Sequence, residues 1–194
     1  NILKTHNAMC TINESKFTNK DNTSGAIYIV RDPRDVAVSF SYHLGITLSE
    51  MVDLMINEEH LISEKDFVLE KKEAGSTFLS SWSNHYNSWK NYNLRKILII
   101  KYEDLIKKTF EKFYEIVLYL NKLEKIEIDV KRIKRSIELT KFRNLQDLEK
   151  KYGFEETTFS KTFFREGKIG SWKKELDKDL SKKIQKAFEA EMIE

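Results

Sequence analysis

Arg31 and Ser39 are residue types that bind anions together. Arg31 follows an apolar run at 26–30, and Ser39 lies eight residues further on. A guanidinium offers a planar fork of N–H donors to an oxyanion, and a hydroxyl adds another donor. The two side chains can therefore converge on one anionic group. The structural alternative is an ion pair of Arg31 with Asp32 or Asp35.

Lys4 and His6 have side chains suited to proton transfer and to the stabilisation of negative charge. The apolar pair before Lys4 predicts that residues 2–5 form the end of a short strand. Residues two apart on a strand point to the same side, so both would face one cleft. An imidazole, with a pKa of about 6.5, can remove a proton from a hydroxyl. A hydrogen-bonded loop histidine is the alternative for His6.

A long loop is expected between residues 152 and 170. It has neither helical nor strand periodicity, and it contains Gly153, Gly167 and Gly170. Loops of this length within compact domains are usually functional or disordered. Arg165 next to Gly167 allows a side-chain fork and a backbone N–H to approach one anion together.

The elements that would position Arg31 are a buried strand, a turn and a helix. The run at 26–30 is typical of a strand covered on both faces of a sheet. Asp32 can cap the next helix, Pro33 suits its first position, and Asp35 complements the helix dipole. Arg31 would then lie at the carboxyl end of a strand, where open α/β sheets bind ligands.

The rest of the chain alternates one further strand with helices. The second strand is expected at 96–100, directly before Tyr102, and residues 13–24 are expected to form a loop beside the cleft. One helix is expected to begin at the capping box Thr47-Leu-Ser-Glu50, and the next to run from Ser76 with a core-type aromatic stripe at Phe78, Trp82, Tyr86 and Trp89. A long helix is expected from Leu105 to Leu120, and another after Asp129 with Val130, Ile133 and Ile137 buried. The helix that closes the chain is expected to have Leu180, Ile184, Ala187 and Phe188 on one face.

Composition narrows the class of protein. The length of 194 residues and the hydrophobic content of 40% suit one domain. Three expected strands are too few to form a sheet that so many helices could cover. The sequence therefore predicts a domain that is incomplete at its N-terminus. The formal charge of +3 is too balanced for a general nucleic-acid or membrane-surface protein. The single Cys10, the lack of a signal-peptide pattern and the lack of an apolar run near ~18 residues predict a soluble, cytoplasmic protein. No metal-ligand cluster is visible, and His43, His60 and His85 are interpreted as ordinary helix residues.

Four segments, taken in order, resemble the cytosolic-type sulfotransferase family. They are Lys-Thr-His at 4–6, Tyr-Ile-Val-Arg-Asp-Pro-Arg-Asp-Val-Ala-Val-Ser at 28–39, Tyr-Glu-Asp at 102–104, and Arg-Glu-Gly at 165–167 with Gly-Ser-Trp-Lys at 170–173. The resemblance implies a P-loop-like three-layer α/β/α fold with a mostly parallel central sheet. It also implies transfer of a sulfuryl group from 3′-phosphoadenosine-5′-phosphosulfate (PAPS) to a small acceptor, without a metal.

The resemblance assigns roles by position. His6 matches the general base, and Lys4 matches the lysine near the transferred group. The remaining matches are nucleotide ligands: Arg31, Ser39, Arg165 and Gly167 for the 3′-phosphate, Tyr102, Thr140 and Phe142 for the adenine, and Phe163 and Phe164 in the loop that closes over the nucleotide.

Three departures from the family pattern accompany the resemblance. The loop that binds the 5′-phosphosulfate has no counterpart before Lys4. Glu166 replaces the usual lysine beside the 3′-phosphate, where an acid is unfavourable unless it points away, and Lys168 could compensate. The dimer motif of many animal relatives is not recognisable at 173–183, so any oligomer would form by another route.

The sequence therefore predicts a PAPS-dependent sulfotransferase with His6 as base, acting on a hydroxyl or amine of a small acceptor, with neither nucleic acid nor membrane as partner. One alternative is a catalytically inactive relative that binds adenosine 3′,5′-bisphosphate (PAP). The other is a P-loop nucleotide kinase, which would bind ATP better than PAPS.

Overall fold

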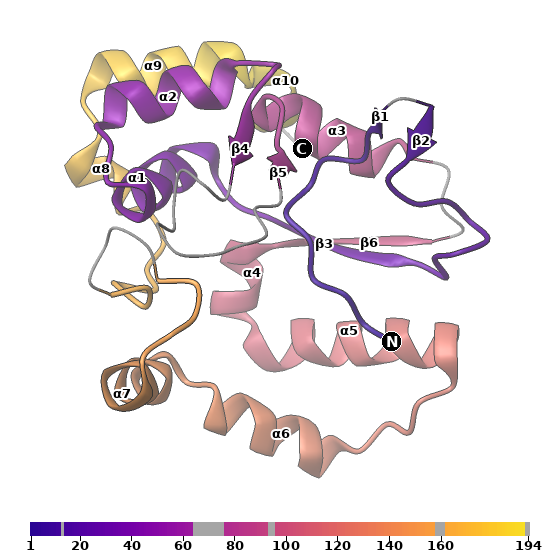
Figure 1. Ribbon diagram of the computed structural model, residues 1–194. Coiled ribbons are helices and arrows are strands. Elements are labelled where there is room, and N and C mark those ends of the chain that lie inside the picture. Colours follow the sequence, from indigo (N-terminus) through magenta and orange to yellow (C-terminus); the bar gives the residue numbers. More distant parts are fainter. Residues whose placement is uncertain (13, 64–75, 93–95, 158–161, 193–194) are drawn as a thin grey trace.

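A pair of parallel strands, β3 (Ala26–Val30) and β6 (Ile97–Lys101), lies at the centre of the fold. The computed structural model describes residues 1–194 except 13, 64–75, 93–95, 158–161 and 193–194 (Figure 1). Helices lie on both sides of this pair, with α3 (Trp82–Lys90) on one side and α5 (Thr109–Glu124) on the other (Figure 1). The α/β class with a parallel sheet is confirmed. Ile29 is 54% exposed, so the expected burial of β3 on both faces is wrong at this position.

The helix that follows β3 begins as the sequence predicts. Helix α1 spans Pro33–Leu44, Asp32 caps it by accepting from the Arg34 backbone N–H, and proline occupies its first turn. Gly45 ends the helix in the left-handed conformation, with φ of 66°. Arg31 is thereby placed between the end of β3 and the start of α1.

The main core joins α1 to two further helices. Helix α2 (Leu48–Ile56) opens with the predicted capping box of Thr47 and Glu50, in which each side chain bonds the backbone of the other residue. Helix α9 (Lys178–Ala187) packs against both helices. The residues buried in this core are Ala37, Leu44, Met51, Val52, Met55, Leu176, Ile184 and Phe188.

The predicted helix from Ser76 begins later than expected. Residues Ser76–Phe78 form strand β5, which pairs antiparallel with β4 (Leu61–Ser63). Ser80 then adopts a φ of 57°, and Ser81 caps α3. The aromatic spacing at 82, 86 and 89 is helical, whereas Phe78 belongs to the preceding strand. His60 lies just before β4 and not in a helix, which corrects its interpretation.

The expected strand at residues 2–5 is wrong. The first ten residues have no regular structure, and Ile2 and Leu3 are 83% and 90% exposed. A strand needs a neighbour for its backbone hydrogen bonds, and no strand in the described ranges pairs with this segment. The expected loop at 13–24 includes β2 (Ser15–Lys16), which pairs with β1 (Thr11–Ile12).

The second half of the chain is helical. The expected long helix from Leu105 is broken at Lys108 into α4 (Tyr102–Lys107) and α5. Asp129 caps α6 (Val130–Leu139) as predicted, and Ile133 is buried, but Val130 is 41% exposed, contrary to prediction. The remaining helices are α7 (Phe142–Tyr152), α8 (Trp172–Glu175) and α10 (Glu189–Met192).

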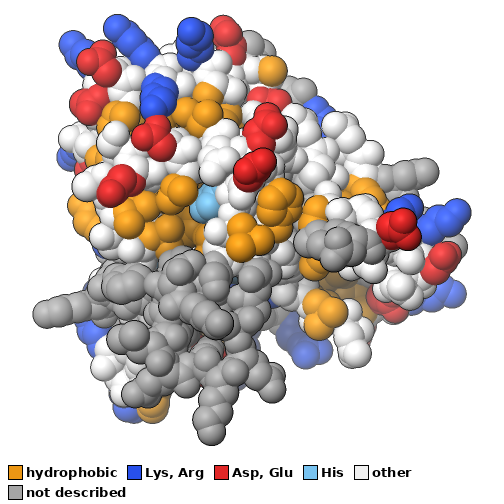
Figure 2. All heavy atoms as spheres, turned by 45° about the horizontal axis from the view of Figure 1, so that its top comes forward, with side chains coloured by type: hydrophobic (Ala, Val, Ile, Leu, Met, Phe, Trp, Pro, Cys, Tyr) orange, Lys and Arg blue, Asp and Glu red, His pale blue; other side chains and the backbone are white. Residues whose placement is uncertain are grey.

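Charges of both signs are mixed on the surface. Figure 2 shows Lys and Arg side chains next to Asp and Glu side chains on one face, and Lys183 of α9 pairs with Asp53 of α2. Among the described residues, no helix is long and apolar enough to cross a bilayer.

Candidate functional site

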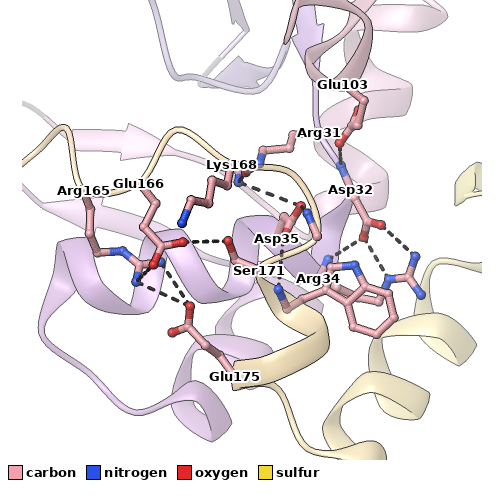
Figure 3. A network of polar contacts seen from close by, with 12 residues as sticks. Arg31, Asp32, Arg34, Asp35, Glu103, Arg165, Glu166, Lys168, Ser171 and Glu175 are labelled. Carbon is pink, nitrogen blue, oxygen red and sulfur yellow. Dashed lines mark hydrogen bonds and ion pairs between the residues drawn. The ribbon is translucent and has the colours of Figure 1, made fainter. Parts of the chain in front are cut away.

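Arg31 is held at the carboxyl end of β3 by one hydrogen bond, one long ion-pair contact and one aromatic ring. Its Nη2 donates to the Lys168 carbonyl at 2.9 Å and lies 3.9 Å from an Asp35 carboxylate oxygen (Figure 3). The guanidinium carbon is 4.6 Å from the centroid of the Tyr102 ring. Its buried Nε has no hydrogen-bond partner within the described parts of the chain. An unpaired buried donor is costly, so this guanidinium retains capacity for an anion.

Asp32 does not neutralise Arg31. Its carboxylate accepts two hydrogen bonds from the Arg34 guanidinium, at 2.9 and 2.7 Å (Figure 3). The Arg34 guanidinium also lies 3.9 Å above the Trp172 ring. The structural alternative for Arg31 is thus limited to the long contact with Asp35.

Asp35 ties the loop after Gly167 to the start of α1. Its side chain is 1% exposed and accepts from the backbone N–H groups of Gly170 at 2.6 Å and Trp172 at 3.1 Å. Hydrogen bonds to a buried carboxylate are stronger than neutral ones. The carboxylate thus holds residues 168–172 next to Arg31.

Arg165 lies at the other end of the same face of α1. Asp35, Ser39 and Tyr42 follow one another at steps of four and three residues, so they share one side of the helix. The Arg165 guanidinium stacks 4.0 Å from the Tyr42 ring centroid and lies 3.4 Å from Glu175. The exposed Ser39 therefore lies between the regions contacted by Arg165 and by Gly170. In this arrangement Arg165 does not face Arg31 (Figure 3).

Glu166 is engaged within its own loop. One carboxylate oxygen accepts from the Ser171 hydroxyl at 2.9 Å, and the other lies 3.6 Å from the Arg165 guanidinium (Figure 3). The hydrogen bond from Ser171, followed by the charges of Arg165, Lys168 and Lys174, lowers the pKa of Glu166. The acid that departs from the family pattern is thus ionised and paired.

Position 167 requires glycine, because the Phe142 ring packs directly against its backbone. Its φ is 60°, and a Cβ placed on it would lie 2.4 Å from the Phe142 ring. The same ring meets Phe164 edge to face at 6.2 Å between centroids. A flat aromatic surface therefore lies directly against the backbone of the 165–167 segment.

Phe163 and Phe164 form an aromatic cluster with Phe154. The centroid of the Phe154 ring lies 4.6 Å from that of Phe163 and 5.1 Å from that of Phe164. The carboxylate of Glu149, on α7, accepts from the backbone N–H groups of both phenylalanines. The loop is thus fixed to α7 at its start and to α1 at its end.

Thr140 uses its hydroxyl within its own helix. It ends α6 and donates to the Ser136 carbonyl at 2.8 Å. It lies two residues before Phe142, whereas Tyr102 lies next to Arg31. The structure therefore places the expected adenine-lining residues in two groups, one at Arg31 and one at Gly167.

Lys4 and His6 are exposed at the start of the chain. Lys4 forms an ion pair with Glu156, which lies between Phe154 and Phe163 in the sequence. The pKa of His6 is lowered mainly because the imidazole is partly removed from solvent, and the positive charge of Lys4 lowers it further. The negative charge of Glu156 raises the pKa and so opposes both effects. The neutral form of the His6 imidazole is therefore favoured at pH 7.

Comparison with known proteins assigns the family. The model of the sulfotransferase domain matches residues 1–194. The chain belongs to the sulfotransferase domain family. It is 28% identical to cytosolic sulfotransferase 12 of Arabidopsis thaliana, over 97% of this chain and 55% of that protein, and 28% identical to sulfotransferase 2A6 of Rattus norvegicus, over 98% and 63%. The chain thus spans about 55 to 63% of the length of these relatives.

Solved structures of sulfotransferases share the fold. Mouse sulfotransferase SULT7A1 complexed with PAP superimposes with a TM-score of 0.61 at 22% identity, covering 86% of this chain and 57% of that one. Retinol dehydratase in a complex with retinol and PAP gives a TM-score of 0.60 at 20% identity, covering 84% and 46%. These neighbours support the P-loop-like α/β architecture.

The sulfotransferase segments expected to form the site are brought together in part. The end of β3, one face of α1 and residues 165–172 adjoin one another through the contacts of Arg31 with Lys168, Asp35 with Gly170, and Tyr42 with Arg165. Ser39 lies on that face of α1, and Gly167 lies within that segment, against Phe142. The guanidinium of Arg165 is directed to Tyr42 and Glu175 instead of towards Arg31.

Sequence reasoning missed the residues that fix this sulfotransferase loop. Asp35 was expected to complement the helix dipole or to pair with Arg31, not to hold the loop, and Glu149 and Glu175 were not singled out. An aspartate one helical turn after Arg31, in the first turn of a predicted helix, was the available signal for Asp35. The partners of Glu149 and Glu175 are set by tertiary packing, so no local pattern could identify them.

Proposed function

We propose that this chain provides the nucleotide 3′-phosphate site and the general base of a cytoplasmic sulfotransferase that uses PAPS as donor. The observation that carries the proposal is the buried, unpaired Nε of Arg31, at a strand end that adjoins the loop 165–172. The family membership and the PAP bound in the structural neighbours support the choice of nucleotide. Cytosolic relatives support the location.

The nucleotide would be held from two distant parts of the chain. Arg31 would donate from Nε and Nη to the 3′-phosphate, Ser39 would add its hydroxyl, and Gly167 would add a backbone N–H. Arg165 would join them after its guanidinium leaves Glu175. Tyr102, Thr140 and Phe142 would line the adenine, and Phe163 and Phe164 would cover the nucleotide.

Proton transfer would be carried out by His6. Its imidazole, neutral because its pKa is lowered, would take the proton from the acceptor hydroxyl or amine as the acceptor attacks sulfur. Sulfuryl transfer resembles phosphoryl transfer in building negative charge on the leaving oxygen. Lys4 would stabilise this charge once its ammonium exchanges Glu156 for the donor.

The acceptor would be a small molecule. Relatives named as an amine sulfotransferase and a 3-beta-hydroxysteroid sulfotransferase, and the retinol complex of retinol dehydratase, support a small hydroxyl or amine compound.

Sulfate transfer from PAPS to a panel of phenols, alcohols and amines tests the proposal with the full-length protein. We expect turnover with at least one acceptor, and its loss in His6→Ala with PAP affinity unchanged within a few fold. PAP binding without transfer to any acceptor would favour the inactive relative. The engagement of Arg165 by Glu175 is the observation that favours this second function. Tighter binding of ATP than of PAPS would indicate a kinase.

A further inference from the structure

Tyr28, His85 and His6 are linked by consecutive hydrogen bonds. The Tyr28 hydroxyl lies 2.8 Å from Nδ1 of His85, and Nε2 of His85 lies 3.0 Å from the backbone carbonyl oxygen of His6. The three residues belong to β3, to α3 and to the irregular first segment. The chain of contacts thus joins the central sheet to the backbone of the proposed base.

The chemistry of the contacts defines the tautomer of His85. A carbonyl oxygen only accepts, so Nε2 must carry a proton. In the neutral ring Nδ1 is then a bare acceptor, and the Tyr28 hydroxyl donates to it. Burial is the main cause that lowers the pKa of His85 and raises that of Tyr28, so both side chains are neutral at physiological pH.

The same face of α3 holds the backbone beyond His6. Trp89 donates from Nε1 to the Asn7 carbonyl at 3.0 Å, and Ser88 accepts from the Met9 backbone N–H at 2.9 Å. Residues 85, 88 and 89 lie three and four positions apart, on one side of the helix. Because the first segment has no secondary structure, these side chains supply hydrogen bonds that a strand neighbour would otherwise provide.

We propose that His85 is a positioning residue, which fixes the backbone of His6 through Nε2 and is itself oriented by the Tyr28 hydroxyl. This proposal rests on the proposed function, since it assigns His85 to the placement of the base. A displacement of about 1 Å of a reacting group costs orders of magnitude in rate. His6 lies in an exposed, irregular segment, and His85 is the side chain from the helix that anchors it directly. Tyr28 lies on the strand that leads to Arg31, so the same strand orients both ends of the site.

The decisive variant is His85→Phe, which keeps a ring but removes both hydrogen bonds. We expect kcat for sulfate transfer to fall at least ten-fold, while KM for PAPS and affinity for PAP stay within two-fold. His85→Gln, whose amide can donate to the His6 carbonyl, should recover part of kcat. Tyr28→Phe, which leaves the His85 ring without its fixed orientation, should give an intermediate loss.

Trp89→Phe is the matched control, because it removes the anchor at Asn7 and keeps the one at His6. Equal losses of kcat in His85→Phe and Trp89→Phe, or no rescue by glutamine, would overturn the proposal in favour of a general structural role. Melting temperatures identify any variant that fails to fold. If His85→Phe fails to fold, Tyr28→Phe takes its place in the comparison with Trp89→Phe.

Nitrogen NMR of the imidazoles separates this proposal from the proposed function. Wild-type His85 should show the neutral Nε2–H tautomer, and the resonances of His6 should shift in His85→Phe but not in Trp89→Phe. If wild-type protein binds PAP without turnover, the proposed function fails, and these spectra alone decide whether His85 positions His6. An Nδ1–H tautomer would refute the positioning role.

Discussion

Oδ2 of Asp35 accepts a hydrogen bond from the backbone N–H of Gly170 at 2.6 Å, across 135 positions of sequence. This contact brings the loop after Arg165 against the helix that follows Arg31. Together with the hydrogen bonds from Trp172 to Asp35 and from Arg31 to the Lys168 carbonyl, it fixes the two cationic segments of the candidate site relative to each other. The buried carboxylate therefore links the stability of the fold to the formation of the anion site.

Asp35→Ala should destabilise the protein and weaken PAP binding together. The substitution leaves the backbone N–H groups of Gly170 and Trp172 without their acceptor, at an expected cost of about 1 to 3 kcal/mol in the free energy of unfolding. Urea denaturation measures this change. Asp53→Ala, which removes an exposed ion pair with Lys183, is the control and should change the free energy of unfolding by less than about 1 kcal/mol. Equal effects of the two substitutions would show that Asp35 does not hold the loop.

Arg31→Ala should weaken PAP binding by roughly 1.5 to 3 kcal/mol, the range for hydrogen bonds to a charged group. Isothermal titration with PAP measures this change. Arg132→Ala, which removes an exposed guanidinium from α6, should leave the affinity unchanged. Unaltered affinity in Arg31→Ala would remove this residue from the site, whatever happens to turnover.

Glu175→Gln should increase the affinity for PAP a few fold. Glu175 holds the Arg165 guanidinium at 3.4 Å over the Tyr42 ring, and loss of its charge releases Arg165 towards the phosphate. A partly exposed pair of this kind contributes about 1 kcal/mol or less. The substitution also removes the hydrogen-bonded carboxylate that raises the pKa of Tyr42, so this pKa should fall towards its usual value. Glu115→Gln, which breaks a surface ion pair with Lys112 on α5, is the control for the measurement of PAP affinity by calorimetric titration. Weaker binding in Glu175→Gln would show that Glu175 supports the site.

The parts of the fold predicted correctly have local causes. Asp32 and Pro33 begin α1, and Thr47 with Glu50 begins α2, because a cap involves only residues within one turn of the helix. The strand before Arg31 was recognised by its β-branched run. The position of Arg31 at a strand end followed from these local signals alone.

The parts missed or wrong depend on distant partners. Residues 2–5 have strand-like composition but lack a neighbouring strand within the described chain, and Ser76–Phe78 pairs with residues 61–63 instead of joining α3. The role of Asp35 depends on a backbone N–H 135 positions away, and the placement of Arg165 beside Glu175 depends on Tyr42 of α1. The resemblance identified the candidate residues, whereas tertiary packing decides where their side chains point.

The charges beside His6 predict the pH dependence of the reaction. Because the pKa of His6 is lowered, the neutral base should persist below pH of about 6.5, and the acid limb of kcat/KM should lie below that value. Lys4 lowers this pKa and Glu156 raises it. Glu156→Gln should therefore move the acid limb to lower pH, and Lys4→Met should move it to higher pH, even where the maximal rate falls.

Proton NMR titration checks the same shifts without turnover. His6→Ala identifies the imidazole resonance, and His60 is the internal control because its pKa is lowered by burial, with no contribution from Lys4 or Glu156. The two substitutions should move the midpoint of His6 in opposite directions and leave that of His60 in place. Since a lowered histidine pKa means that the unfolded chain binds more protons, stability should also fall as pH drops below about 6.5. Shifts of His6 in the same direction in both variants would show that the substitutions act through its exposure to solvent and not through the charges of Lys4 and Glu156.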